Sequence, residues 1–158
     1  MYFTYLALFF IFYKGEKQMI EVFNGKDLAG WRMRHPEREH KWAVHDGILD
    51  NTAKGVDIIT EGEFGDFYMH LEYLVPKDSN SGIYLRGRYE LQILDSLGKT
   101  YSYPAENGAL YNQKHVDVDA TKPAGEWQTV DVILIGMNLT VLLNGKCTHN
   151  NVIIKGPT

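Results

Sequence analysis

Residues Asn80 to Asp95 read NSGIYLRGRYELQILD, and this stretch decides how the fold is interpreted. With the two-residue period of a β-strand, its aliphatic residues fall on one face and its polar residues on the other. The apolar face takes Ile83, Leu85, Tyr89, Leu91 and Ile93, and the polar face takes Tyr84, Arg86, Arg88, Glu90 and Gln92. Rigid guanidinium forks and amide groups suit a polyol ligand, so we interpret the polar face as a binding surface. The alternative is an outer face covered by salt bridges.

The rest of the chain has the pattern of an all-β protein. Short alternating runs are separated by Gly, Asn, Asp and Pro at roughly ten-residue intervals, and no helical period is sustained. The pairs Asn24-Gly25, Asp46-Gly47 and Asn144-Gly145 supply the positive φ angles that tight hairpins need. The expected strands are 20–23, 41–45, 48–52, 56–60, 67–75, 82–94, 128–135, 139–143 and 146–149.

Length and composition fit one domain with a sizeable core. The chain has 158 residues, of which 44% are hydrophobic and 13% aromatic, and nothing marks a second domain. A formal net charge of -4 gives no basic surface for nucleic acid, whereas a neutral sugar ligand fits. Cys147 is the single cysteine, which excludes an internal disulfide and a zinc site built from several thiolates. Composition leaves the oligomeric state and the compartment open.

The N-terminal residues 1–18 are set apart by an apolar run from Tyr2 to Tyr13. The run is too short to cross a bilayer and has the length of a signal-peptide core, which would place the protein outside the cytoplasm without a transmembrane span. It lacks a preceding Lys or Arg and a small-residue cleavage site. Two further interpretations therefore stay open: sequence upstream of a true start at Met19, and a first strand or interfacial anchor. We expect residues 1–18 to stand apart from the sheets and residues 19–158 to form the domain.

The expected strand 67–75 also carries polar groups on one face. Glu72 lies on that face, and the alternate positions are apolar. If this strand pairs antiparallel with 82–94 through the short connection between them, Glu72 shares a sheet face with Arg86 and Glu90. Such a pairing would gather one site from two neighbouring strands.

The segment 96–126 shows no strand period and is long enough to be a functional loop. Its tyrosines indicate an ordered segment, because disordered tracts are poor in aromatic residues. We interpret it as a lid or rim over the polar face, with Tyr111, His115 and Lys122 as ligand contacts. A structural crossover of a Greek-key sandwich is the alternative interpretation.

Several catalytic motifs are missing from the sequence. It contains no phosphate-binding loop, dinucleotide fingerprint, nucleophile elbow or His-Glu-x-x-His zinc motif. Glu72 and Glu90 could serve a conventional glycosidase as acid and as base or nucleophile. Laminarinase-type jelly rolls, however, carry their carboxylates on one strand as Glu-x-Asp-x-x-Glu, and the strand here reads ELQILD from Glu90 to Asp95. Asp95 is either a turn former or a ligand, and Trp127 either packs at a sheet end or stacks on a sugar ring.

Seven sequence blocks together carry a family resemblance. They are VFNGKDLAGW (22–31), WAVHDGIL (42–49), EFGDFYMHLEY (63–73), NSGIYLRGRYELQILDS (80–96), GALYNQ (108–113), KPAGEWQ (122–128) and LLNGK (142–146). In this order they closely resemble the 3-keto-disaccharide hydrolase domain family, over nearly everything from Met19 to the end. Seven ordered blocks are far more specific than any single motif.

The resemblance implies a concanavalin A-like jelly roll, which has two curved antiparallel sheets with a concave sugar-binding face and is usual in exported bacterial proteins. It also implies cleavage of glycosides already oxidised to a ketone at sugar carbon 3. A 3-ketone acidifies the C2 proton, so a carboxylate or His base can remove it, the glycosidic oxygen then leaves, and water addition completes net hydrolysis. The base candidates are Glu72, Glu90 and His115, and Arg86 or a bound divalent metal would stabilise the enolate.

The expected substrate contacts on this interpretation are Arg86, Gln92, Asp95, Tyr111, Lys122 and Trp127. Family members continue past residues 156–158 into a further loop and a final strand, which the resemblance implies are missing here. The alternative to an enzyme is a noncatalytic carbohydrate-binding module on the same fold. Two glutamates beside an arginine favour proton transfer over simple binding, because lectin sites on this fold favour neutral amides and aromatics.

Overall fold

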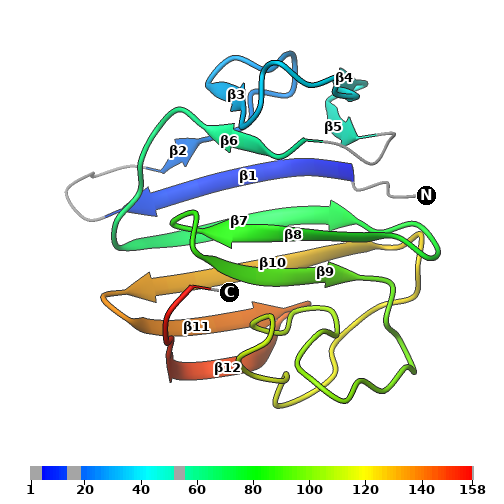
Figure 1. The fold of residues 1–158 in the computed structure, drawn as a ribbon, viewed down its shortest axis with the longest axis vertical. Helices are drawn as coiled ribbons and strands as arrows, with labels where there is room; N and C mark the ends of the chain where they lie inside the picture. The colour runs from blue at the N-terminus through cyan, green and yellow to red at the C-terminus, as the bar shows by residue number, and fades with distance from the viewer. Residues whose placement is uncertain (1–4, 14–18, 52–55, 158) are drawn as a thin grey trace.

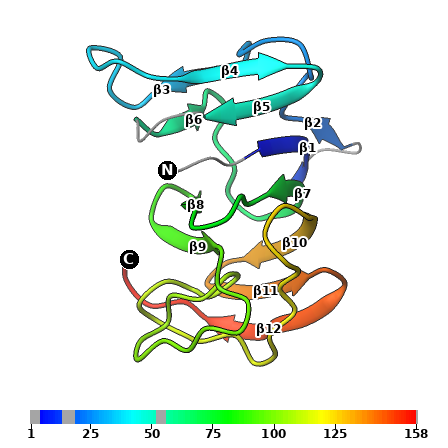
Figure 2. The same ribbon diagram turned by 90° about the vertical axis from the view of Figure 1, so that its right-hand side faces the viewer.

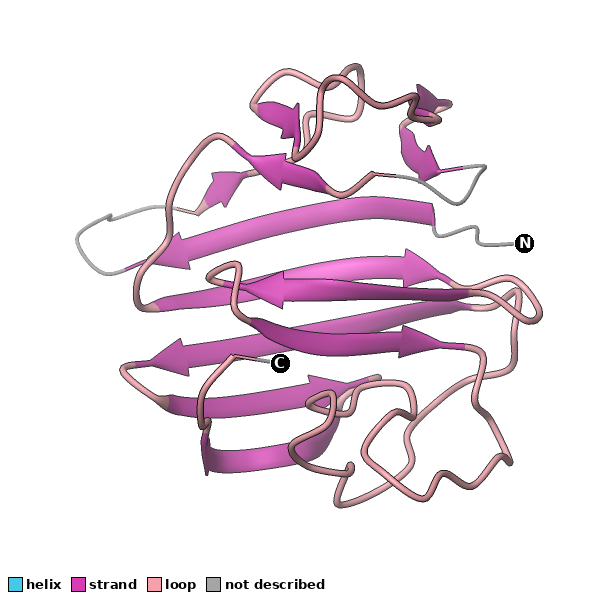
Figure 3. Ribbon diagram, in the orientation of Figure 1, coloured by secondary structure: helices cyan, strands magenta, loops and turns pink. Residues whose placement is uncertain are grey.

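The computed structural model describes residues 5–13, 19–51 and 56–157. The regular secondary structure within these residues consists of β-strands (Figure 3). The strands, shown in Figure 1, are β1 (Tyr5–Tyr13), β2 (Ile20–Glu21), β3 (Trp31–Met33), β4 (Trp42–His45), β5 (Ile48–Asn51), β6 (Ile58–Thr60), β7 (Phe67–Leu74), β8 (Asn80–Leu85), β9 (Tyr89–Leu94), β10 (Trp127–Ile135), β11 (Asn138–Leu143) and β12 (Lys146–Ile153). Within these parts of the chain, no helix has the length and apolar content that crossing a membrane requires.

The strands form two layers that pack face to face, as Figures 1 and 2 show. The larger sheet has the order β12-β11-β10-β7-β1-β5-β4, with β2 paired to β1, and its strand pairs are antiparallel. The hairpin β8-β9 lies over β7 and β10 and belongs to the second layer. β3 and β6 form a further antiparallel pair near β4 and β5. This architecture confirms the predicted all-β, two-sheet antiparallel jelly-roll sandwich.

The core fills the space between the layers and follows from the alternation within each strand. β7 buries every second residue from Phe67 to Tyr73, and β10 and β11 alternate in the same way. Leu85 and Tyr89 are buried against them from the hairpin. Burying a large apolar side chain stabilises a fold by about 1.5–3 kcal/mol, so this period holds the layers together. The buried Tyr73 hydroxyl donates to Asn107 Oδ1 at 3.0 Å, which ties the core to the segment between β9 and β10.

The stretch from Asn80 to Asp95 is a hairpin, so the prediction of one strand over 82–94 is wrong. The chain reverses at Arg86 and Gly87, whose φ angles are 53° and 64°. The loop between β8 and β9 has three residues, and this odd number keeps even-numbered residues of both strands on one face. Tyr84 therefore lies directly across from Glu90. The predicted polar face survives, although Arg86 and Arg88 leave it for the loop.

β7 pairs with β1 and β10, so the predicted pairing of this strand with 82–94 is also wrong. Glu72 lies opposite Thr129 of β10. The residues on either side of Glu72 are buried, so its side chain lies on the face of the larger sheet away from the core. The connection after β7 carries the chain to the other layer, because the β7 edges are already paired within the larger sheet. Glu72 and Glu90 consequently lie on opposite faces of the sandwich.

Strand β1 corrects our expectation that residues 1–18 stand apart from the sheets. It lies between β5 and β7 and pairs with β7 from Tyr5 to Tyr13. A continuous apolar run has no two-residue period, yet such runs do form central strands, so the missing period was weak evidence. Residues 1–4 and 14–18 lie outside the described residues. An export role for this segment stays a prediction.

Two of the three hairpins predicted from local turn chemistry are confirmed, whereas Asn24-Gly25 lies in the loop between β2 and β3, which pair with other strands. Asp46 and Gly47 join β4 to β5 with φ angles of 50° and 79°, and Asn144 and Gly145 join β11 to β12 with 50° and 76°. Other strand ends differ from the expected ranges by a few residues, and β12 runs on to Ile153. Strand β3 was not predicted, and residues 52–55, where two expected strands meet, lie outside the described residues.

Candidate functional site

The outer face of the β8-β9 hairpin is extended by a segment of the loop that follows it. Gly108 donates its N–H to the Gln92 carbonyl at 2.8 Å, and Tyr111 donates to the Glu90 carbonyl at 2.9 Å. Leu110 is buried opposite Leu91, so its neighbour Tyr111 is directed to the polar side of β9. The loop interpretation of 96–126 as a rim of the polar face therefore describes residues 108–112 correctly.

Glu90 is the central carboxylate of this face. Its Oε2 accepts a hydrogen bond from the Tyr84 hydroxyl at 3.0 Å. Its side chain lies across Gly82, where an added Cβ would be 2.3 Å from Oε1. Half-burial raises the pKa of Glu90 above its usual value, the Tyr84 hydrogen bond opposes this shift, and the negative charge of Asp57 adds to it. The site thus holds a carboxylate that is oriented and partly desolvated.

Arg34 and Asp57 carry charge to the same face from the β3-β6 pair. Arg34 Nη1 lies 3.0 Å from Asp57 Oδ2, and both side chains are more than half exposed. Asp57 influences the pKa values of both Glu90 and Tyr84, which places it within electrostatic range of the hairpin. Sequence reasoning missed these two residues because each follows or precedes a three-residue strand with no extended polar pattern.

Two tyrosines of the loop continue the polar face beyond Glu90. The rings of Tyr103 and Tyr111 meet edge to face, with centroids 6.1 Å apart and planes at 84°. The pKa of Tyr111 is raised by its hydrogen bond with Tyr103, and the charge of Glu90 contributes as well. Tyr103 and Tyr84 are 48% and 46% exposed, so aromatic surface flanks the carboxylate on both sides.

Gln92 and Asp95, both predicted substrate contacts, are engaged within the protein. Gln92 is buried, and its Nε2 donates to Asn80 Oδ1 at 2.7 Å. Asp95 Oδ2 accepts the backbone N–H of Asp78 at 2.9 Å and lies 3.5 Å from Lys99 Nζ. These contacts match the turn-forming interpretation of Asp95 and place Gln92 beneath the face.

Arg86 anchors the hairpin loop to the larger sheet. Its Nε donates to the Gly65 carbonyl at 2.7 Å, Nη1 donates to the Gly136 carbonyl at 2.6 Å, and Nη2 lies 3.1 Å from Asp66 Oδ1. Asp66 Oδ1 also accepts the N–H of Gly136 at 2.8 Å. The guanidinium is thus held at the end of β7 and at the β10-β11 turn, away from the mid-strand position beside Glu90 that we predicted.

Glu72 lies beside a hydrogen-bonded group of Tyr68, His70 and Asp131 on the opposite face of the sandwich. Asp131 Oδ1 accepts the Tyr68 hydroxyl at 2.6 Å and lies 2.7 Å from His70 Nδ1, while His70 Nε2 lies 3.9 Å from Glu72 Oε1. Partial burial, with help from Asp131, raises the pKa of Tyr68 to about 12. The structure therefore does not bring Glu72 to the polar face of the hairpin.

Trp127 belongs to the larger sheet, and Lys122 contacts its backbone. Trp127 begins β10 opposite Leu74, and its neighbour Gln128 is buried, so the indole belongs to the face away from the core. Lys122 Nζ donates to the Trp127 carbonyl at 2.9 Å. The Lys122 backbone N–H donates to the oxygen of the Gln128 side-chain amide, and the nitrogen of that amide donates to the Lys122 carbonyl. Neither predicted contact is grouped with Glu90.

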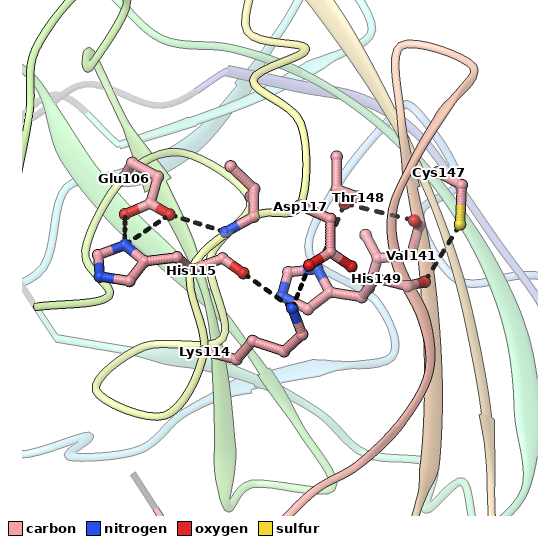
Figure 4. Close-up of polar contacts among 9 residues, drawn as sticks. Glu106, Lys114, His115, Asp117, Val141, Cys147, Thr148 and His149 are labelled. Carbon is pink, nitrogen blue, oxygen red and sulfur yellow. Dashed lines mark hydrogen bonds and ion pairs between the residues drawn. The ribbon is translucent and has the colours of Figure 1, made fainter.

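His115 pairs with Glu106 in a separate cluster that Figure 4 shows. Its Nδ1 lies 2.9 Å from Glu106 Oε2, and Oε1 accepts the Val116 N–H at 2.8 Å. Burial alone would raise the pKa of Glu106, but hydrogen bonds from backbone N–H groups and His115 outweigh it and lower the pKa. An ion pair between Lys114 and Asp117 completes the cluster, which joins the loop to β12. His115 is oriented by a carboxylate, although no contact links it to Glu90.

Comparison with known proteins gives a family. A model of the 3-keto-alpha-glucoside-1,2-lyase-like domain matches residues 18–158. The chain belongs to this family. The resemblance to 3-keto-disaccharide hydrolases that we inferred from seven sequence blocks is thereby confirmed.

The chain is also similar to individual proteins and solved structures. A 3-keto-disaccharide hydrolase of Bacteroides thetaiotaomicron is 25% identical over 73% of this chain, and the chain spans about half of that relative, 52% of its length. A crystal structure from Parabacteroides distasonis, assigned as a glycosyl hydrolase, has a TM-score of 0.77 and 33% identity, covering 88% of this chain and 67% of its own. Another from the same organism with the same assignment has a TM-score of 0.67 and 25% identity over 81% and 68% of the two chains.

The family resemblance leaves a divalent metal open, and the described part of the chain shows no set of donors that fits one. Among the residues that the structure describes, no group of three or more His, Cys, Asp or Glu side chains could hold a metal ion. Glu90 has a tyrosine hydroxyl as its hydrogen-bond partner and Asp57 as its acidic neighbour.

Proposed function

We propose that this chain cleaves glycosides that carry a ketone at sugar carbon 3, with Glu90 as the base that removes the C2 proton. The observation that carries the proposal is the half-buried Glu90 carboxyl, held by Tyr84 at 3.0 Å on an open polar face, with its pKa raised by burial. A raised pKa brings a carboxylate closer to the working pH and makes it a stronger base once ionised. Membership of the family supports a 3-keto glycoside as the class of substrate.

The reaction needs one group that first accepts and then returns a proton. The C2–H bond breaks, its proton moves to Glu90, and the electron pair delocalises into the C3 carbonyl as an enolate. The enolate then expels the glycosidic oxygen from C1, and that oxygen takes a proton from the protonated Glu90. Water adds across the resulting C1–C2 double bond, with hydroxyl at C1 and hydrogen at C2, which gives net hydrolysis. The Tyr84 hydroxyl orients the carboxylate through its hydrogen bond.

The separation of the two predicted glutamates supports this route over a conventional glycosidase mechanism. That mechanism places two carboxyl groups on either side of one glycosidic bond. Glu72 and Glu90 lie on opposite faces of the sandwich and cannot do so. Asp57 is the acidic neighbour of Glu90, and its carboxylate is ion-paired with Arg34.

The test compares wild-type protein with Glu90→Gln on methyl 3-keto-α-glucoside and on its unoxidised parent, with products measured by mass spectrometry. We expect the wild type to cleave only the oxidised substrate, and Glu90→Gln to lower turnover by about 10²- to 10⁴-fold, the usual contribution of general acid–base catalysis. Glu72→Gln is the matched control, because it makes the same change on the opposite face, and it should retain activity. Near wild-type turnover by folded Glu90→Gln would remove Glu90 from the mechanism.

A noncatalytic carbohydrate-binding module is the second candidate function. The exposed rings of Tyr84 and Tyr103 favour it, because aromatic side chains bind the apolar faces of sugars. This candidate predicts saccharide binding by calorimetry with no product from either substrate. Product release from the oxidised substrate alone would rule it out.

A further inference from the structure

We propose that Tyr103 and Tyr111 form the binding platform for the leaving group, so that the ketone-bearing ring lies at Glu90 and the second sugar ring lies on Tyr103. This inference rests on the proposed function and specifies which substrates the site prefers. It assigns to the loop between β9 and β10 the discrimination between disaccharides and glycosides with small leaving groups.

The order of side chains along the face supports this assignment. Tyr111 donates its backbone N–H to the Glu90 carbonyl at 2.9 Å, so it occupies the position next to Glu90 across the strand pair. Tyr103 lies one ring further, 6.1 Å from the Tyr111 centroid. The face therefore runs from Tyr84 through Glu90 and Tyr111 to Tyr103. A substrate with one ring at the carboxylate has its next ring in the direction of the tyrosine pair or in that of Tyr84.

The geometry of the pair favours the Tyr103 side. The two rings stand at 84° to each other, which forms an aromatic corner that can contact a pyranose ring from two directions. Tyr103 is 48% exposed, so its ring has surface available for a ligand. Tyr84 has its hydroxyl committed to Glu90 and sits directly across from it, where the first ring would lie.

The platform is held in place before any ligand binds. The N–H of Asn112 donates to the Pro104 carbonyl at 2.8 Å, which fastens the two tyrosine-bearing stretches to each other. The N–H of Asn107 donates to Ser96 Oγ at 2.9 Å, and Ala105 and Asn107 are buried. A preorganised surface loses little conformational entropy on binding, so these rings can contribute affinity.

The experiment measures kcat/KM of wild type, Tyr103→Ala and Tyr103→Phe on two substrates that share the reacting ring, 3-keto-maltose and methyl 3-keto-α-glucoside. Tyr103→Ala removes one aromatic contact with the leaving group, so it should lower kcat/KM for the disaccharide by roughly 3- to 10-fold. The methyl glycoside should be unaffected, and Tyr103→Phe should retain the preference because the ring remains. Trp127→Ala, which removes an exposed aromatic ring from the opposite face, is the matched control and should change neither value.

The outcomes separate this inference from the proposed function. Failure of wild type to cleave methyl 3-keto-α-glucoside would contradict the proposed function, whereas equal losses on both substrates in Tyr103→Ala would contradict the platform. If no turnover occurs, calorimetric titration with maltose still decides, because Tyr103→Ala should weaken binding roughly 3- to 10-fold and Trp127→Ala should not. Unchanged maltose affinity in Tyr103→Ala would then overturn the inference.

Discussion

Gly82 shows how a single missing Cβ shapes the site. The Glu90 side chain occupies the space that a Cβ would fill, with Oε1 only 2.3 Å from that position. We predict that Gly82→Ala displaces the carboxylate from Tyr84 and lowers turnover of a 3-keto-glucoside by on the order of 10²-fold, as expected for a misplaced catalytic group. The fold should persist, because the nearest atoms belong to the end of a flexible side chain. Gly65→Ala is the control, since nothing lies within 4 Å of its added Cβ.

The pKa of Glu90 gives a prediction with opposite signs for two variants. A base must be ionised, so kcat/KM should fall as the pH drops through the Glu90 pKa, which burial places above the reference value of 4.5. Asp57→Asn removes a negative neighbour and should move this acidic limb to lower pH. Tyr84→Phe removes a hydrogen bond that favours the ionised form and should move it to higher pH. A pH–rate profile that shifts in the same direction for both variants would contradict the assignment.

Strand β1 gives a prediction at the scale of elements. It pairs with β7 over eight residue pairs and also pairs with β5, so its deletion would divide the larger sheet. Each lost backbone hydrogen bond costs about 0.5–1.5 kcal/mol, and a few kcal/mol lower the melting temperature by roughly 10 °C or more in a domain of this size. We predict such a drop for deletion of residues 1–18, measured by circular dichroism. Deletion of residues 1–4 alone, which precede β1, is the control.

The accuracy of the sequence predictions followed the range of the interactions involved. Hairpins at Asp46-Gly47 and Asn144-Gly145 could be predicted because positive φ angles are encoded locally by these pairs. The turn at Arg86-Gly87 lacks that signature, so the hairpin was taken for one strand. Its three-residue loop preserved the alternation, and Tyr84 and Glu90 were still assigned to the correct face. The pairing of β1 with β7 depends on distant residues and left no local pattern.

At the scale of the whole molecule, the location of the predicted site also depended on contacts between residues far apart in the sequence. Glu90 and Tyr111 were predicted to share one face because of strand period and loop length, and they do lie side by side. The alternation of apolar and polar residues along β7 also predicted that Glu72 points away from the core. It did not predict which of the two layers contains β7. Layer assignment comes from the packing of the two sheets, and it moved Glu72 and Trp127 to the far face.

The buried His149 predicts how stability responds to pH. Burial lowers its pKa below the reference value of 6.5, so below pH 6.5 the unfolded chain takes up a proton more readily than the folded one. The free energy of unfolding should therefore be highest above pH 6.5 and fall as the pH decreases toward the lowered pKa. Urea titrations between pH 5 and 8 measure this. A stability independent of pH in this window would contradict the assignment, and His149→Gln should flatten the slope.

The central place of β1 also fixes when the sheet can form. The ribosome makes this strand before its partner β7, whose residues from Phe67 to Leu74 emerge some sixty residues later. At about 5–20 residues per second, the nascent apolar run waits several seconds before β7 exists. High contact order slows folding further, because closing the intervening loop costs entropy before the pairing of β1 with β7 can stabilise the sheet. During that interval the run is accessible to chaperones, and a chaperone that binds it competes directly with completion of the sandwich.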